Sequence, residues 1–253
     1  MTLILYEFPL NETARTALRL ERLFARFGLL LQRTDGLDHH HALMTLFEIL
    51  EVCTRSDLKG DLFKEIERQK AYFLSLSDNP AVDKAALLRI TEGLTHVAAE
   101  LTQLEGKIGA SLQSNDWLMS VRGRTMIPGG CFEFDTPTYH AWLHRAPAVR
   151  QADLQQWYSP LAVVSHCISL LLDLMRQNGV AKRMVAVAGQ FQQSLPQGRS
   201  MHLLRLAMPA GSLYVPEVTG HRLMISMRML SPDAQGRYKS TQNDVDFEMA
   251  FCS

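Results

Sequence analysis

The chain changes character at Asn178-Gly179, and this change constrains the fold more than any other feature of the sequence. Up to residue 177, apolar side chains recur at the three- and four-residue spacing of amphipathic helices. Beyond that point, short extended runs are separated by glycine and proline, and no segment has a convincing helical pattern. We therefore predict an α+β fold, with a helical N-terminal domain followed by a strand-rich C-terminal domain.

The first residues depart from this order. Residues 1–9 (MTLILYEFP) are rich in strand formers and end at a proline, so we predict that they form a strand and join the C-terminal antiparallel sheet. The predicted domains are 12–178 for the helical domain, and 1–11 with 179–253 for the β-domain. The C-terminal strands are expected at residues 184–188, 201–208, 213–215, 223–230 and 245–251.

Capping residues indicate where the helices begin. Asn11, Asp38 and Asp83 each precede a stretch with helical periodicity, and either Asp57 or Asp61 precedes another. Later in the helical part, a glycine-rich tight turn leads into an expected short extended piece at residues 131–135, after which the helical pattern resumes.

The sequence has the marks of a soluble cytoplasmic protein. No apolar run approaches the ~20 residues of a membrane helix, so we expect no membrane insertion. The four cysteines lie far apart, without a C-x-x-C pair, and therefore indicate reduced thiols rather than disulfides or a zinc site.

Charge is unevenly distributed along a chain whose net charge is zero. Residues 174–230 hold seven basic side chains and a single acid, Glu217, which gives this segment a charge of +6. Such asymmetry predicts that the C-terminal part binds a negatively charged partner.

One run within the basic segment, residues 220–230 (GHRLMISMRML), alternates like a strand. One predicted face, which suits a core, carries His221, Leu223, Ile225, Met227 and Met229. The other predicted face carries Arg222, Met224, Ser226, Arg228 and Leu230, with its two guanidinium groups about 20 Å apart. Flexible methionine between arginines suits a surface that binds an acidic and apolar partner, although an ordinary half-buried strand has the same pattern.

Patterns that often indicate metal binding or catalysis are weak in this chain. His140 and His144 share a helix face, with Cys131 and Asp135 upstream, but the zinc-protease pattern requires glutamate where Ala141 stands. Consecutive histidines at 39–41 point apart on a helix and are expected at a solvated helix start. The turn at residues 127–130 (IPGG) lacks the spacing of a phosphate-binding loop. We therefore expect no catalytic residues, no metal and no cofactor.

Nucleic-acid binding is the alternative that the basic C-terminal segment leaves open, because phosphate binding mainly needs clustered arginine and lysine. Single-strand binders usually add aromatic stacking platforms, and residues 220–230 contain no Phe, Tyr or Trp. This absence favours a protein partner, with no nucleic acid.

Several motifs occur in order and at near-constant spacing from about residue 5 to the C-terminus. They are Phe8-Pro-Leu-Asn-Glu12, residues 127–135 (IPGGCFEFD), Pro137-Thr-x-His-x-Trp-Leu-His144, Leu172-Asp-Leu-x-Arg-Gln177, Tyr214-Val-Pro216, Gly220-His221 and Asp246-Phe-Glu-x-Ala250. Together they resemble the ZapD family of Z-ring-associated cell division proteins. The spacer within residues 127–135 is one residue longer here than the family pattern.

The resemblance implies a cytoplasmic, non-enzymatic homodimer that acts in septation at mid-cell. Such proteins bind the C-terminal tail of FtsZ, the tubulin-like division protein, and bundle its protofilaments. The family's tail-binding residues correspond here to Arg55, Arg222 and Arg228. The sequence departs from the pattern at Met224, where relatives can carry another arginine, and this implies weaker or less salt-dependent binding.

Overall fold

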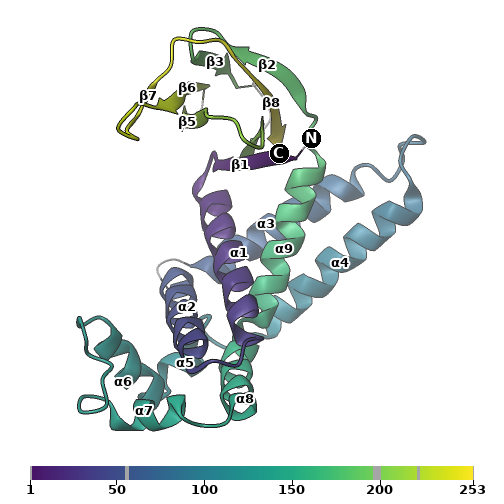
Figure 1. The fold of residues 1–253 in the computed structure, drawn as a ribbon. Coiled ribbons are helices and arrows are strands. Elements are labelled where there is room, and N and C mark those ends of the chain that lie inside the picture. Colours follow the sequence, from purple (N-terminus) through teal and green to yellow (C-terminus); the bar gives the residue numbers. More distant parts are fainter. Residues whose placement is uncertain (1, 55–56, 196–200, 221–222, 253) are drawn as a thin grey trace. The chain divides into compact units, whose positions relative to one another are not determined.

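The computed structural model describes residues 2–54, 57–195, 201–220 and 223–252, drawn as ribbon in Figure 1. The chain forms two compact units, which are Met1–Leu18 with Leu172–Ser253 (the β-unit) and Arg19–Leu171 (the helical unit). Helices dominate the N-terminal part and antiparallel strands the C-terminal part, so the predicted α+β fold class is confirmed. The domain limits of 12–178 against 1–11 and 179–253 stay a prediction.

Side-chain caps set the starts of most long helices. The helices are α1 (Glu12–Leu31), α2 (Gly36–Thr54), α3 (Leu58–Leu74), α4 (Lys84–Gln103), α5 (Ala110–Gln113), α6 (Asp116–Thr125), α7 (Pro137–Leu143), α8 (Pro147–Tyr158), the 3-10 turn η1 (Ser159–Leu161) and α9 (Ala162–Gln177). Asn11, Asp57 and Asp83 accept backbone N–H groups of the first turns of α1, α3 and α4, as predicted.

The cap predicted for α2 is wrong by three residues. Asp35 Oδ1 accepts the Leu37 N–H at 2.7 Å, and α2 begins at Gly36. Asp38 lies inside the first turn, where it pairs with Arg33 at 3.0 Å. The sequence offered two aspartates three residues apart, and only the upstream one precedes the helix.

Aromatic side chains hold α6, α7 and α8 together within the helical unit. Trp117 stacks on Trp157 with ring centroids 5.3 Å apart, and Tyr139 stacks on Trp142 at 5.9 Å. Tyr139 and Trp142 are buried, so these large rings form the core of this part of the unit.

The segment before α7, residues 131–135, is not extended as predicted. Its residues form successive turns, in which Phe132 O accepts the N–H groups of Asp135 and Thr136 at 3.1 and 2.9 Å.

Pro147–Gln177, which comprises α8, η1 and α9, is long and apolar enough to cross a membrane by length and composition alone. The core helix of a soluble protein can have the same length and composition, and α9 supplies several buried leucines to the core. The stretch is also interrupted by the 3-10 turn at Pro160. Length and composition alone are weak evidence for membrane insertion.

The β-unit contains two antiparallel sheets. The strands are β1 (Leu3–Pro9), β2 (Lys182–Ala186), β3 (Gln190–Ser194), β4 (Leu203–Pro209), β5 (Val215–Gly220), β6 (Met224–Pro232), β7 (Tyr238–Ser240) and β8 (Val245–Cys252). The first sheet has the order β1-β4-β8-β2, and the second has the order β3-β6-β5 with β7 paired to β6. Tyr6 lies opposite Leu206, so the prediction that the N-terminal strand joins the C-terminal sheet is confirmed.

The inner faces of the two sheets share one hydrophobic core. From the first sheet it takes alternate residues such as Leu204, Leu206 and Phe247, and from β6 it takes Ile225 and Met227. Each of these side chains is at most 3% exposed. The predicted inward face is therefore confirmed for Ile225, Met227 and Met229. It is wrong for Leu223, which is 68% exposed, and His221 lies outside the described residues.

The sequence did not indicate β3 or β7, and it placed β5 too early. β3 has the sequence QFQQS, which offers only Phe191 as an inward aromatic group, against Phe247 at 5.3 Å between ring centroids. β7 is three exposed residues long. A polar edge strand lacks the alternation that marks a half-buried strand, and for this reason the second sheet was not predicted as a separate layer.

A tight turn between β2 and β3 requires glycine. Ala188 and Gly189 both have positive φ, at 48° and 72°. A Cβ on Gly189 would lie 2.3 Å from Thr241 O, a backbone atom that cannot move aside cheaply. After this turn β3 pairs with β6 in the register that sets Gln190 opposite Arg228.

Ionic contacts tie β1 into the β-unit. The Glu7 carboxylate accepts hydrogen bonds from Nε and Nη2 of Arg176, at 2.9 and 2.8 Å. It also lies 3.1 Å from Nε of Arg205 on the neighbouring strand β4. Only 12% of the Glu7 side chain is exposed. The arrangement joins the end of α9 to two strands through one largely buried carboxylate.

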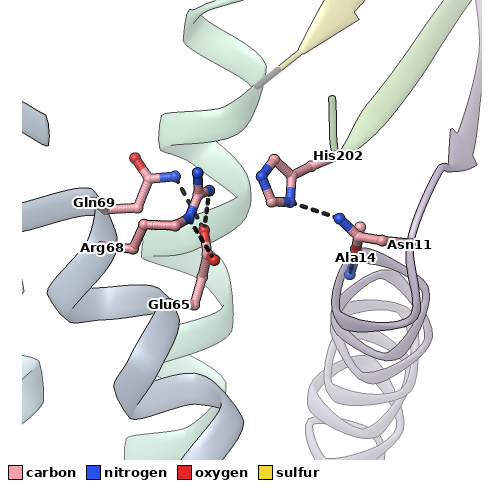
Figure 2. A network of polar contacts seen from close by, with 6 residues as sticks. All are labelled: Asn11, Ala14, Glu65, Arg68, Gln69 and His202. Atoms are coloured by element: carbon pink, nitrogen blue, oxygen red, sulfur yellow. Dashed lines mark hydrogen bonds and ion pairs between the residues drawn. The ribbon is translucent and has the colours of Figure 1, made fainter. Parts of the chain in front are cut away.

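Two further polar networks are drawn in Figure 2, one in each unit. In the β-unit, Asn11 caps α1 through Ala14 N and also contacts His202 Nδ1 at 2.7 Å. In the helical unit, Glu65 receives hydrogen bonds from Arg68 and Gln69 one turn later on α3. Each network satisfies a buried or half-buried polar group within its own unit.

Candidate functional site

The outward side chains of the β3-β6-β5 sheet form the candidate binding surface, called the outer face below. Its rows follow from the strand register and are Gln190–Arg228–Glu217, Gln192–Ser226–Thr219 and Ser194–Met224, with Val215 and Leu230 at one end. Met224, Val215 and Leu230 are half-buried, while Arg228 is exposed. The outer face therefore combines a cation with partly exposed apolar groups.

Arg228 is paired on this face with the acid opposite it. Its Nε donates to Glu217 Oε2 at 3.0 Å, and Nη2 donates to the same oxygen. The two side chains are 60% and 44% exposed, so water screens the pair and its net contribution to stability is about 0–1 kcal/mol. An incoming carboxylate can therefore replace Glu217 at little cost.

The other predicted binding residues divide between described and undescribed parts of the chain. Met224 opens β6 opposite Ser194 on the outer face, as the alternation predicted. Arg55 and Arg222 lie outside the described residues. The run at 220–230 is not one strand, because Gly220 ends β5 and pairs with Ile225 of β6. The single strand expected over residues 220–230 is therefore wrong.

The structure also reduces the charge asymmetry expected from the sequence. Arg176 and Arg205, two of the seven basic residues in the +6 segment, are committed to Glu7, which lies far outside that segment. The whole β-unit holds ten basic and eight acidic side chains. Counting along the sequence missed this compensation because the neutralising acid comes from the first strand.

The paired histidines on α7 make local contacts. His144 Nδ1 lies 2.9 Å from the carbonyl oxygen of His140, and the ring centroids are 4.4 Å apart. Asp135 faces Arg124 at 3.9 Å. Across the ranges that the structure describes, no three His, Cys, Asp or Glu side chains are grouped as ligands for a metal ion.

The prediction that residues 39–41 form a solvated helix start is wrong for two of the three histidines. His39 is fully buried, and its Nδ1 accepts a hydrogen bond from Arg150 Nε at 2.8 Å. His40 Nδ1 lies 2.5 Å from the Tyr139 hydroxyl. Burial lowers the pKa of both rings below the ordinary value of 6.5. Their partners are distant in sequence and were not evident from the motif.

The helical unit also contains a cavity of about 890 Å³ beside these histidines. Apolar side chains line most of it, and the His40–Tyr139 pair and Cys131 are also part of the lining. The lining comes from α2, α7 and the turn at residues 127–130, whose Gly130 N–H donates to Ile127 O at 2.9 Å. Three separate segments meet here, so no single motif indicated the cavity.

The cysteines are not activated for nucleophilic chemistry. Burial raises the pKa of Cys53 and of Cys167 to about 12, and also raises the pKa of Cys131 and Cys252. Thiols with raised pKa values stay protonated near neutral pH, and the thiolate is the reactive form.

Comparison with known proteins identifies the class to which this fold and face belong. The family model described as "ZapD: Cell division protein" matches residues 18–228. The cell division protein ZapD of Janthinobacterium sp. (strain Marseille) is 41% identical over 99% of this chain and all of its own length. ZapD proteins of Nitrosomonas eutropha and Azoarcus sp. (strain BH72) are 39% and 38% identical, again over 99% of this chain and their full lengths.

A match of this extent covers both units, from the first strand to the end of the last sheet. The chain therefore belongs to the ZapD family of cell division proteins.

Proposed function

We propose that this protein binds the acidic and apolar C-terminal tail of FtsZ on its outer face and, as a homodimer, cross-links FtsZ protofilaments into bundles. The role is non-enzymatic and cytoplasmic, at the Z-ring of the division site. Family membership supports the role in division, and the resemblance of the motifs to Z-ring-associated proteins supports FtsZ as partner. The observation that carries the site is Arg228, exposed on the same face of β6 as Met224 and Leu230.

The outer face suits such a peptide chemically. A tail carboxylate gains charge-assisted hydrogen bonds from the Arg228 guanidinium when it replaces Glu217. Apolar tail residues gain contact with Met224, a flexible side chain that adapts to different shapes. Arg55 and Arg222, which lie outside the described residues, are proposed as additional cations of the same interface.

Weak individual sites are sufficient for bundling. A two-fold dimer presents two sites, and a protofilament presents many tails. Multivalent binding of this kind raises avidity by ~10²–10⁴ without any new contact. Because each contact is weak and electrostatic, bundles can dissolve when salt or tail occupancy changes.

A charge reversal tests the site directly. Arg228→Glu should weaken binding of a fluorescently labelled FtsZ-tail peptide by roughly a hundredfold, since it removes a cation and adds a repelling charge. Arg183→Glu makes the same change of charge on β2, in the other sheet, where the side chain is 93% exposed. Equal affinities of both variants, with circular dichroism unchanged, would refute the assignment to the outer face.

The ion pair offers a second test, in the opposite direction. Glu217→Gln frees Arg228 from its partner and should tighten tail binding several-fold at low salt. Met224→Arg should also tighten tail binding and should steepen its salt dependence.

The protein should not shift non-specific DNA in a gel at micromolar concentration and physiological salt. A clear shift would instead favour nucleic acid as the partner of the basic residues.

A further inference from the structure

The cavity of the helical unit has the size and the lining of a small-molecule site. Its volume of about 890 Å³ lies within the range of ~300–1,000 Å³ that is usual for ligand pockets. Apolar side chains predominate in the lining, and they include Leu37, Met44, Ile127, Phe132 and Leu143. The outer face shares no residue with this lining, so the cavity has no part in the proposed contact with FtsZ.

The walls of the cavity are preformed. A Cβ on Gly130 would lie 2.4 Å from the carbonyl oxygen of Arg124, so only glycine lets the turn at residues 127–130 pack this closely on α6. Tyr139 is fully buried, and its hydroxyl lies 2.5 Å from His40 Nδ1, which joins α7 to α2. A preformed cavity loses little conformational entropy when a ligand enters it.

Several large apolar side chains at the cavity are left in contact with water. Leu37, Ile127 and Phe132 are 64%, 50% and 56% exposed, although all three belong to the lining. Phe134, which is 77% exposed, stacks on Phe132 with ring centroids 5.9 Å apart. A ligand that covers these groups gains free energy in proportion to the apolar area that it removes from water.

The charge of the lining selects the kind of ligand. Among the residues that the structure describes, the lining contains no Asp, Glu, Lys or Arg. Burial raises the pKa of Cys131 and of Tyr139 and lowers that of His40, so these three groups stay neutral. The exposed rings of His41 and His144 are the remaining titratable groups, and an imidazole can carry only positive charge. The cavity therefore suits an apolar ligand with an anionic group.

We propose that this cavity binds a free fatty acid, with its alkyl chain on the apolar lining and its carboxylate at His41 and His144. An imidazolium ring donates N–H groups to a carboxylate in charge-assisted hydrogen bonds. A flexible alkyl chain matches the lining better than a rigid aromatic ligand does, because the lining is largely aliphatic and includes the adaptable side chain of Met44. This site is independent of the proposed function, so a failure to bind FtsZ would leave it standing.

Two amphiphiles of equal chain length and opposite charge test the ligand class. Sodium dodecanoate, titrated into the full-length protein at neutral pH, should bind with a micromolar Kd in calorimetry. Dodecyltrimethylammonium should bind at least tenfold more weakly, because its charge has the wrong sign. Failure of dodecanoate to bind, or equal affinities for the two amphiphiles, would overturn the proposal.

A pair of methionine variants tests the location of the alkyl chain. Met44→Trp places a larger side chain in the lining and should weaken dodecanoate binding at least tenfold. Met126→Trp is the matched control, since Met126 is 83% exposed and lies outside the lining, and it should bind like the wild type. Equal affinities of the two variants, with native circular dichroism, would show that the chain does not occupy the cavity.

A charge reversal tests the location of the carboxylate. His41→Glu should weaken dodecanoate binding about tenfold and should tighten binding of dodecyltrimethylammonium, a change of preference that misfolding cannot produce. His96→Glu makes the same change on α4, where the side chain is 67% exposed, and should leave both affinities unchanged. An unchanged preference in His41→Glu would refute the position of the carboxylate.

Cys131 reports occupancy in the unsubstituted protein. It lines the cavity and is partly exposed, whereas the other three cysteines are buried. Saturating dodecanoate should therefore slow its reaction with a thiol reagent several-fold. Unchanged reactivity despite calorimetric binding would place the ligand elsewhere.

Vesicles of phosphatidylglycerol separate a free fatty acid from a membrane surface. The protein should not sediment with them, because the proposed site is a cavity for a single chain. Sedimentation with vesicles in the absence of dodecanoate binding would show that the exposed phenylalanines contact a bilayer instead, and would overturn the proposal.

Discussion

The β-unit holds a partly buried arginine and the helical unit a buried one, and the two units compensate the charge in different ways. In the β-unit, Arg176 forms a bidentate ion pair with the carboxylate of Glu7. In the helical unit, Arg150 is 4% exposed, and no carboxylate among the described residues pairs with it. Its guanidinium donates instead to His39 and to the carbonyl groups of Thr34, Leu143 and Arg145.

The comparison shows that a buried cation needs hydrogen-bond acceptors more than an opposite charge. Carbonyl oxygens carry partial negative charge and fill the donor positions of the guanidinium. The cost is a dependence on His39, which must stay neutral to accept from Arg150. An ion pair has no such requirement on a neighbouring ring, so the two sites should respond differently to substitution and to pH.

The largest effect is expected from Arg150→Met. This substitution leaves the buried ring of His39 and the carbonyl groups of Thr34 and Leu143 without their donor, at a cost of about 4 kcal/mol in unfolding free energy. Urea unfolding followed by tryptophan fluorescence measures it, because the chain's tryptophans lie in the helical unit. Arg33→Met, at an exposed surface pair, is the control and should change stability by less than about 0.5 kcal/mol.

Glu7→Gln should cost somewhat less, about 3 kcal/mol, because it leaves two partly buried arginines without their shared anion. Calorimetry detects it as a lower unfolding temperature. Glu12→Gln removes an acid whose side chain is 82% exposed, and should leave that temperature nearly unchanged. A result in which both variants behave alike would show that the Glu7 network contributes little.

Lowering the pH should reduce the free energy of unfolding through His39, and so should increase the difference between the two arginine sites. Burial lowers its pKa below 6.5 in the folded state, so the unfolded chain takes up the proton more readily. The stability contribution is therefore complete above about pH 6.5 and is lost as the pH falls below that value. His39→Gln can accept from Arg150 and donate to Arg33 without titrating, and should flatten the decline in urea midpoint between pH 7.5 and 5.5. His40, whose pKa is also lowered, accounts for a remaining slope.

The smallest losses of stability are expected from substitutions at two helix caps. Asn115→Ala removes one cap of α6, to Leu118 N at 3.0 Å, and should cost about 1 kcal/mol. Asn11→Ala should cost more, since Asn11 caps α1 and also contacts His202 (Figure 2). Equal losses in thermal unfolding would mean that the His202 contact adds nothing.

The sequence predicted what depends on periodicity and local caps. The helical N-terminal part followed by a strand-rich C-terminal part, the capping by Asp83 and the inward face of Ile225 and Met227 all depend on local patterns, and they were confirmed. It did not predict contacts between distant segments, such as His39 with Arg150 or Glu217 with Arg228. These partners are selected by tertiary packing, which leaves no signal at a fixed spacing. Of the proposed site, Met224 and Arg228 were placed on one face by alternation alone, as the register has them.

The pairing of β1 with β4 has a consequence for the folding of the chain during its synthesis. β1 is synthesised before the helices, yet β4, its only sheet neighbour among the described residues, is synthesised after them and places Pro209 opposite Leu3. The apolar strand β1 must therefore remain unpaired while the helices are synthesised. During that interval it is a natural target for chaperones, and a protein truncated before β4 should be prone to aggregation rather than merely inactive.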